Sequence, residues 1–182
     1  ISNLNLSGNT TRREPTRALV ISGSAAPVLS DISISNFNYG IVANNPGATP
    51  VNLNIDNLQF DRGTAESQST DTAIDISGNY QVIIDQAIIQ GYINGLRIES
   101  TNQSRARARL TNTRVIKTES SNRDASIGVA LYNLSQVEVV GDSLRGYNTG
   151  ILISGTQSSP SQYQISGCHL SRDSQFTGSE RG

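Results

Sequence analysis

Small and aliphatic residues recur in a fixed four-residue pattern along the chain. The pattern is a small residue, an aliphatic residue, any residue and a second aliphatic residue, and its six copies begin at Ala18, Gly40, Ala73, Gly95, Gly128 and Gly150. The copies are separated by 22, 33, 22, 33 and 22 residues. Alternation of apolar and free positions is typical of a β-strand with one dry face, so the pattern predicts one strand that recurs in every unit of a repeat.

A second pattern of alternating aliphatic residues, closed by a residue that is mostly Asn or Gly, lies between copies of the first. Its seven copies begin at Leu4, Ile32, Leu53, Val82, Ala108, Val137 and Tyr163, and equivalent residues of successive copies are expected to stack. A single unit cannot bury its apolar face alone, but units stacked about 4.8 Å apart merge their apolar columns into one core. The two patterns predict an all-β solenoid of parallel strands with rungs of about 22 residues and loop insertions.

Corners and loops follow from the same spacing. The residue after each second-pattern strand is expected to turn a sharp corner, because Gly, and next to it Asn, tolerates a positive φ. These residues are Gly8, Asn36, Asn57, Gln86, Asn112, Gly141 and Gly167. The extra residues of the 33-residue units must leave the solenoid as loops, within 61–72 and at about 116–126, and both loops are predicted to project from the same side.

The segments IIQGYINGLRI and LRGYNTGILI are similar to the rung consensus of the pectin-lyase-like superfamily. This resemblance, over residues 4–170, implies a right-handed single-stranded parallel β-helix. A left-handed β-helix with strict hexapeptide repeats is the main alternative, and the uneven spacing argues against it. We expect a single domain over 1–182 with a polar tail at 171–182. Neither end carries an amphipathic capping helix over its open strand edges, so the chain is expected to be an excerpt of a larger protein or to have its ends covered by partners.

Composition and charge narrow the choice of partners and cofactors. The formal net charge of −1 and the shortage of aromatic residues among the arginines disfavour nucleic acid. No apolar run approaches the roughly 18 to 20 residues of a membrane span. One Cys and one His leave no disulfide, zinc cluster or His-based triad within the chain. No cofactor is predicted. The carboxylates of Asp61, Glu66, Asp71 and Asp75 could serve as oxygen ligands of Ca²⁺, but their spacing matches no known calcium-binding loop.

Two outward-facing aspartates, Asp56 and Asp85, are predicted at equivalent positions of neighbouring rungs. Their carboxylates would lie about 5 Å apart, the separation that retaining glycosidases use for an acid and a nucleophile. The alternative is two solvated aspartates in a column that otherwise holds Ser7, Ser35, Thr111, Val140 and Ser166.

A charged group on the first-pattern strand forms a further candidate site. Outward-facing Asp75 is predicted to lie beside Arg97, with Glu99 two residues further along the same strand. The three residues could bind substrate or form a cross-strand ion pair. The small residues that begin each copy are also expected to face outward, which would give this strand a flat surface for a second copy of the chain, another partner or an intramolecular cover.

Arg105, Arg107 and Arg109 alternate with Ala106, Ala108 and Leu110, so the arginines are expected on one face of a strand. Guanidinium groups bind carboxylate, sulfate and phosphate through a planar fork of donors. The segment therefore predicts a site for an acidic polysaccharide, to which Arg97 and Arg114 could add. The alternative is a solvated strand without a ligand.

These observations give three hypotheses. The first is an extracellular or surface-exposed β-helix that binds or scaffolds contact with acidic polysaccharide, as part of a surface protein or phage tailspike. The second is a fragment of a polysaccharide hydrolase or lyase. The third is a structural stalk of associated copies. The resemblance carries no catalytic residue onto this chain, because the sequence lacks the polygalacturonase, pectate lyase and alginate epimerase signatures.

Overall fold

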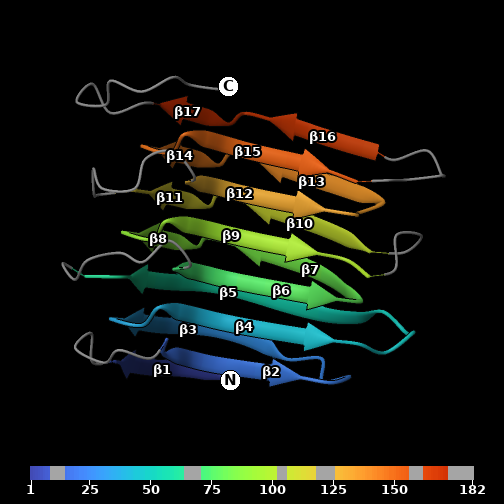
Figure 1. Ribbon diagram of the computed structural model, residues 1–182, viewed down its shortest axis with the longest axis horizontal. Helices are drawn as coiled ribbons and strands as arrows, with labels where there is room; N and C mark the ends of the chain where they lie inside the picture. The colour runs from blue at the N-terminus through green and yellow to red at the C-terminus, as the bar shows by residue number, and fades with distance from the viewer. Residues whose placement is uncertain (9–14, 64–70, 102–105, 118–125, 156–161, 172–182) are drawn as a thin grey trace.

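The computed structural model describes residues 1–8, 15–63, 71–101, 106–117, 126–155 and 162–171. These residues form a right-handed parallel β-solenoid of about 5 turns, with rungs about 26 residues apart and no helix. The predicted rung of 22 residues is the short rung, and the 33-residue rungs raise the average. Figure 1 shows the chain rising rung by rung from the N-terminus to the C-terminus.

One strand of each rung lies in a six-stranded parallel sheet. Its members are β2 (Arg17–Ser22), β4 (Tyr39–Asn45), β6 (Thr72–Gly78), β9 (Asn94–Glu99), β12 (Ile127–Tyr132) and β15 (Thr149–Ser154). Leu19 pairs with Ile41, and Ile41 with Ile74, so the predicted spacing of the first pattern is confirmed as the strand register.

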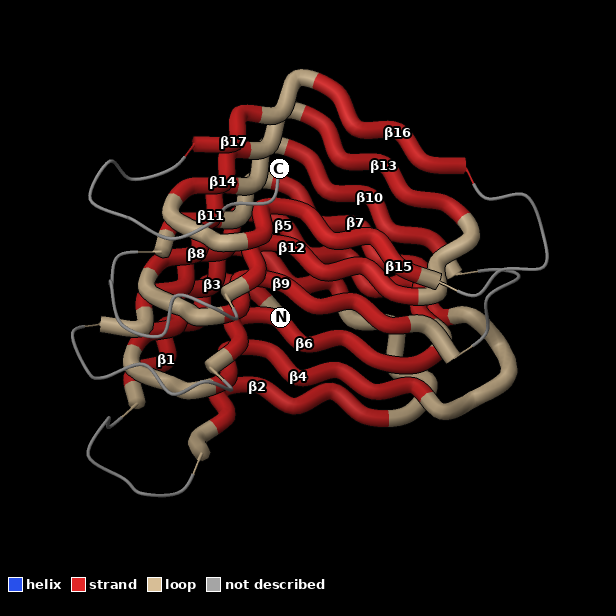
Figure 2. Tube along the Cα trace, turned by 45° about the horizontal axis from the view of Figure 1, so that its top comes forward, coloured by secondary structure: helices blue, strands red, loops and turns tan. Residues whose placement is uncertain are grey.

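The rest of each rung lies in an 11-stranded sheet that bends into two limbs (Figure 2). The first limb contains β7 (Tyr80–Asp85), β10 (Arg107–Thr111), β13 (Gln136–Val140) and β16 (Gln162–Ser166). The second contains β1 (Ser2–Ser7), β8 (Ile88–Gln90), β11 (Arg114–Ile116), β14 (Ser143–Arg145) and β17 (His169–Ser171). Two longer strands, β3 (Val28–Ser35) and β5 (Val51–Asp61), run through both limbs.

A column of residues with positive φ forms the corner between the limbs. The column is Asn3, Asp31, Asn57, Gln86, Asn112, Gly141 and Gly167, with φ between 49° and 70°. The predicted positive φ is confirmed for the last five of these residues and for Asn36, whose φ is 61°. Asn36 and Gly8 lie at a different place, the far end of the second limb, where the Asn36 N–H donates to Asp61 O at 2.9 Å.

The predicted stacking of the second pattern breaks at one step. Leu4 pairs with Ile32 as expected, but Ile32 pairs with Leu58, whereas Leu53 pairs with Val82. The reason is that both limbs carry the same alternation. The copies at Leu4 and Ile32 belong to the second limb, and those from Leu53 onward belong to the first.

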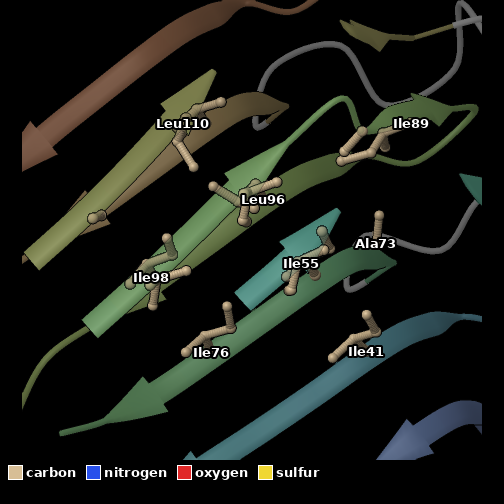
Figure 3. Close-up of a cluster of buried hydrophobic side chains, with 14 of the residues drawn as sticks. Ile41, Ile55, Ala73, Ile76, Ile89, Leu96, Ile98 and Leu110 are labelled. Atoms are coloured by element: carbon tan, nitrogen blue, oxygen red, sulfur yellow. The ribbon is translucent and has the colours of Figure 1, made fainter. Parts of the chain in front are cut away.

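Aliphatic columns from the two sheets fill the space between them. Ile41, Ile76 and Ile98 from the six-stranded sheet and Ile55 and Leu110 from the first limb are at most 2% exposed. Figure 3 shows these side chains in one continuous cluster that crosses several rungs. The buried core therefore continues through successive rungs from Ile21 to Tyr147.

The predicted outward direction of the small first-pattern residues is wrong. Ala73 is 0% exposed, and Gly40, Gly95 and Gly128 are also buried. A Cβ atom at Gly40 would lie 2.5 Å from the ring of Phe60, and one at Gly128 would lie 2.5 Å from Leu144 Cδ2. The small residues are required because the second limb packs directly against the backbone of the six-stranded sheet at this column.

The strands that flank the two long insertions occupy equivalent places in their rungs, whereas residues 64–70 and 118–125, on which the predicted common direction of the loops depends, lie outside the described residues. The first insertion leaves after Asp61 at the end of β5 and re-enters at β6, and the second leaves after β11 and re-enters at β12. Asp71 accepts hydrogen bonds at 2.8 Å from both Arg62 Nε and Asn38 Nδ2, so a buried ion pair closes the base of the first insertion.

Candidate functional site

The two described arginines of the predicted anionic-glycan site lie on β10 in the first limb. Ala106, Ala108 and Leu110 are at most 2% exposed, whereas Arg107 and Arg109 point outward and are exposed. The expected alternation is therefore confirmed over this strand. Arg105 lies outside the described residues.

The strands on either side of β10 determine what the two guanidinium groups meet. Arg109 lies beside Ile83 and Glu138, and its Nε forms an ion pair with Glu138 Oε2 at 3.3 Å. Arg107 lies between Gln81 and Gln136 and has no ion-pair partner among the residues that the structure describes. Arg107 therefore presents an uncompensated positive charge.

A depression of about 390 Å³ covers the outer side of this limb. It is lined by Arg107 and Arg109 with Asn52, Asn54, Gln81, Val82, Ile83, Ala108, Gln136 and Glu138. A second depression of about 440 Å³ continues along β13 and β16, where Gln162, Gln164 and Tyr163 join Gln136 and Glu138. We call the outward residues of both depressions the first-limb face.

The amide residues of this face are the part that the sequence analysis missed. Asn52, Gln81, Gln136 and Gln162 share one column with Arg107 across five rungs. Each directly precedes the first apolar residue of a second-pattern copy. A comparison of that single position between copies would have found them.

Asp75, Arg97 and Glu99 come together on the outer side of the six-stranded sheet. Asp75 pairs with Arg97 in register, and Arg97 Nη1 lies 3.1 Å from Asp75 Oδ1. Arg97 Nη2 also pairs with Glu99, and the guanidinium carbon lies 5.9 Å from the centroid of the Tyr132 ring. Both carboxylates therefore surround one guanidinium, which is already neutralised.

The expected addition of Arg97 and Arg114 to the arginine patch is wrong. Arg97 lies on the outer surface of the six-stranded sheet, on a different side of the solenoid from the outer surface of the first limb (Figures 1 and 2). Arg114 begins β11 in the second limb, beyond the corner at Asn112. The alternation of a strand determines whether a side chain points inward or outward, but not toward which side of the solenoid.

Asp56 and Asp85 lie side by side in the register of β5 and β7, which confirms the predicted adjacency. Asp85 Oδ1 accepts hydrogen bonds from Thr111 Oγ1 at 2.7 Å and from Asn112 Nδ2 at 3.2 Å. Thr111, Val140 and Ser166 share their column as expected, and Ser30 precedes them. Ser7 and Ser35 do not, because they align with Asp61 in the second limb.

The candidate calcium ligands do not form one group. Asp71 is buried against Arg62 and Asn38, and Asp75 pairs with Arg97 on the outer side of the six-stranded sheet. Glu66 lies outside the described residues. Over the described ranges, no group of three or more His, Cys, Asp or Glu side chains is placed to hold a metal ion. No helix in this part of the chain is long and apolar enough to cross a membrane.

Comparison of the chain with family models, with curated proteins and with solved structures finds no match.

Proposed function

We propose that this solenoid binds an elongated, acidic polysaccharide along its first-limb face. The observation that carries the proposal is the column in which Arg107 lies among outward amides, above a depression that continues over several rungs. Asn and Gln side chains offer both donors and acceptors, which suits the hydroxyl groups of a sugar. A chain of sugars laid along the axis would meet equivalent side chains at intervals of about 4.8 Å.

The charge on this face favours a glycan that carries carboxylates. Glu138 neutralises Arg109, so Arg107 supplies the available positive charge among the described residues of the depression. A guanidinium binds a carboxylate through two parallel hydrogen bonds, which are stronger than bonds between neutral groups. The resemblance to the pectin-lyase-like superfamily supports the same ligand class and a location outside the cytoplasm, in a surface protein or tailspike.

The Arg107→Gln variant tests this proposal. Glutamine already occupies the neighbouring positions Gln81 and Gln136, so the variant keeps the outer surface of the sheet intact. We expect at least about tenfold weaker binding of alginate, because a hydrogen bond to a charged group contributes about 1.5–3 kcal/mol. Binding is measured by affinity electrophoresis in alginate gels.

The matched control is Arg97→Gln, which removes a guanidinium from the other sheet and should leave alginate binding unchanged. Equal binding by the wild type, Arg107→Gln and Arg97→Gln would contradict the proposal. Equal losses in both variants would also contradict it, because they would show a general charge effect rather than a site on the first-limb face.

A hydrolase remains the second candidate function, favoured by the adjacency of Asp56 and Asp85. Under our proposal, incubation with acidic and neutral polysaccharides yields no new reducing ends and no ultraviolet absorbance of unsaturated uronates. New reducing ends that disappear in both Asp56→Asn and Asp85→Asn would replace the binding function with hydrolysis. Asp31→Asn is a suitable control, because it changes a carboxylate at the neighbouring corner column.

A structural role in associated copies stays a prediction. The outward column of the six-stranded sheet has Val20 at one end and Leu152 at the other, with the Asp75–Arg97 pair between them. Val20 is 59% exposed.

A further inference from the structure

Asp142 places a carboxylate at an inward position of the solenoid, in a column that otherwise holds uncharged residues over the described rungs. It follows the corner residue Gly141 and shares its inward position with Ala87 and Thr113 on the rungs before it and Cys168 on the rung after it. Asp142 is 1% exposed. Neither pattern of the sequence analysis predicted a buried charge there.

The hydrogen bonds of Asp142 satisfy only half of its carboxylate. Oδ1 accepts a hydrogen bond from the backbone N–H of Thr113 at 2.8 Å, whereas Oδ2 is buried and has no hydrogen-bond partner within the described part of the chain. A buried ionised carboxylate with an unsatisfied oxygen is unfavourable relative to its protonated form. The site therefore favours uptake of a proton.

The groups around Asp142 do not compensate its charge. Asp85 on β7 adds a like charge, and the Cys168 thiol points to the carbonyl oxygens of Val139 and Ser166 at 3.6 and 3.5 Å. Arg114 follows Thr113 on the exposed side of β11, and His169 is exposed on β17. Among the described residues, no cation forms an ion pair with Asp142.

We propose that Asp142 couples proton uptake to the docking of the rung formed by β16 and β17. This rung stacks directly on Asp142, since the backbone N–H of His169 donates to Asp142 O at 2.8 Å. In a solenoid each rung contacts only its neighbours, so the last described rung can open without the others. Opening gives the carboxylate access to water and relieves the cost of its negative charge.

The direction in which docking of this rung depends on pH follows from the raised pKa of Asp142. Burial, opposed by the Thr113 hydrogen bond and reinforced by Asp85, raises the pKa of Asp142 from 3.8 to about 6. Between these values the closed form binds a proton that the open form has lost. Docking is therefore strongest below about pH 4 and weakens as the pH rises through about 6. The full shift corresponds to an increase in the opening constant on the order of a hundredfold.

Amide hydrogen exchange of the whole chain, followed by NMR, tests this proposal. After correction for intrinsic exchange rates, we expect the opening constant at the amide of residue 169 to increase about tenfold between pH 5 and 7.5. The backbone amide of Asn36 donates to Asp61 O near the other end of the solenoid, and its opening constant should not show this dependence on pH. A wild-type opening constant at residue 169 that is independent of pH would overturn the proposal.

Three variants assign the effect. Asp142→Asn should abolish the pH dependence at residue 169, and persistence of the dependence would overturn the proposal. If Asp142→Asn does not fold, Asp142→Thr replaces it in this test, because Thr113 already occupies the equivalent position one rung below. His169→Gln must retain the dependence, because an imidazole ionises in the same pH range. Loss of the dependence in His169→Gln alone would assign the proton to His169 and contradict the proposal.

Discussion

Replacing Asp71 by Ala is expected to lower the free energy of unfolding by about 3–5 kcal/mol, because the variant leaves Arg62 buried without its counterion. The side chains of Arg62 and Asp71 are only 3% and 0% exposed, and Arg62 Nε lies 2.8 Å from Asp71 Oδ2. Asn38 Nδ2 also loses its acceptor, Asp71 Oδ1. The measurement is equilibrium unfolding in urea at pH 7, compared with the wild type.

Asp75→Ala is the matched control for this prediction. Asp75 also belongs to a cross-rung ion pair, but its side chain and that of Arg97 are 25% and 41% exposed. Solvent screens such a pair, so the loss should stay below about 1 kcal/mol. Similar losses in Asp71→Ala and Asp75→Ala would contradict the special importance of the buried pair.

A double variant separates the net contribution of the pair from the penalty of an isolated charge. Replacing Arg62 by Met and Asp71 by Leu together removes both charges and keeps much of the buried volume. We expect this variant to be more stable than Asp71→Ala, because well-packed apolar groups often replace a buried ion pair at little cost. A double variant no more stable than Asp71→Ala would show that the pair itself, with Asn38, holds the base of the first insertion.

Gly95→Ala is expected to destabilise the solenoid by about 2–3 kcal/mol through overpacking. The added methyl group would overlap Val115 Cγ1 and lie 2.5 Å from the carbonyl oxygen of Gly128. The carbonyl belongs to the backbone of the next rung, so it cannot move without displacing β12. The measurement is again urea unfolding, with circular dichroism to verify that the variant retains its strands.

Gly150→Ala is the control, because it adds the same methyl group in the same column. The nearest atom there is Leu170 Cδ2 at 3.1 Å, the end of a side chain that is 48% exposed. We expect a loss below about 1 kcal/mol, since Leu170 can shift at little cost. A loss as large as that of Gly95→Ala would point to glycine's backbone conformation rather than to crowding.

Strand alternation and repeat spacing are properties of the sequence, and they determined much of the fold. The pairing of Leu19 with Ile41 and of Ile41 with Ile74 follows from the positions of the small residues, because equivalent strands must stack to bury their apolar columns. The adjacency of Asp56 with Asp85 follows from the same reasoning.

The division of each rung between two limbs was decided only by the tertiary structure. Both limbs repeat the same alternation, so the sequence does not show that Ile32 stacks on Leu58 instead of Leu53. A period of two residues separates inward from outward positions, but the corners determine toward which side an outward residue points. Arg97 and Arg107 are both outward, yet they lie on different sheets.

The buried polar groups were also decided by tertiary packing. Asp142 and the Arg62–Asp71 pair occupy inward positions that the apolar pattern leaves unassigned, and their burial depends on the rungs above and below. The glycine column is buried for the same reason, because the second limb folds back against it. The sequence by itself determined the strands and their stacking, whereas contacts across the rung decided which polar and small residues are enclosed.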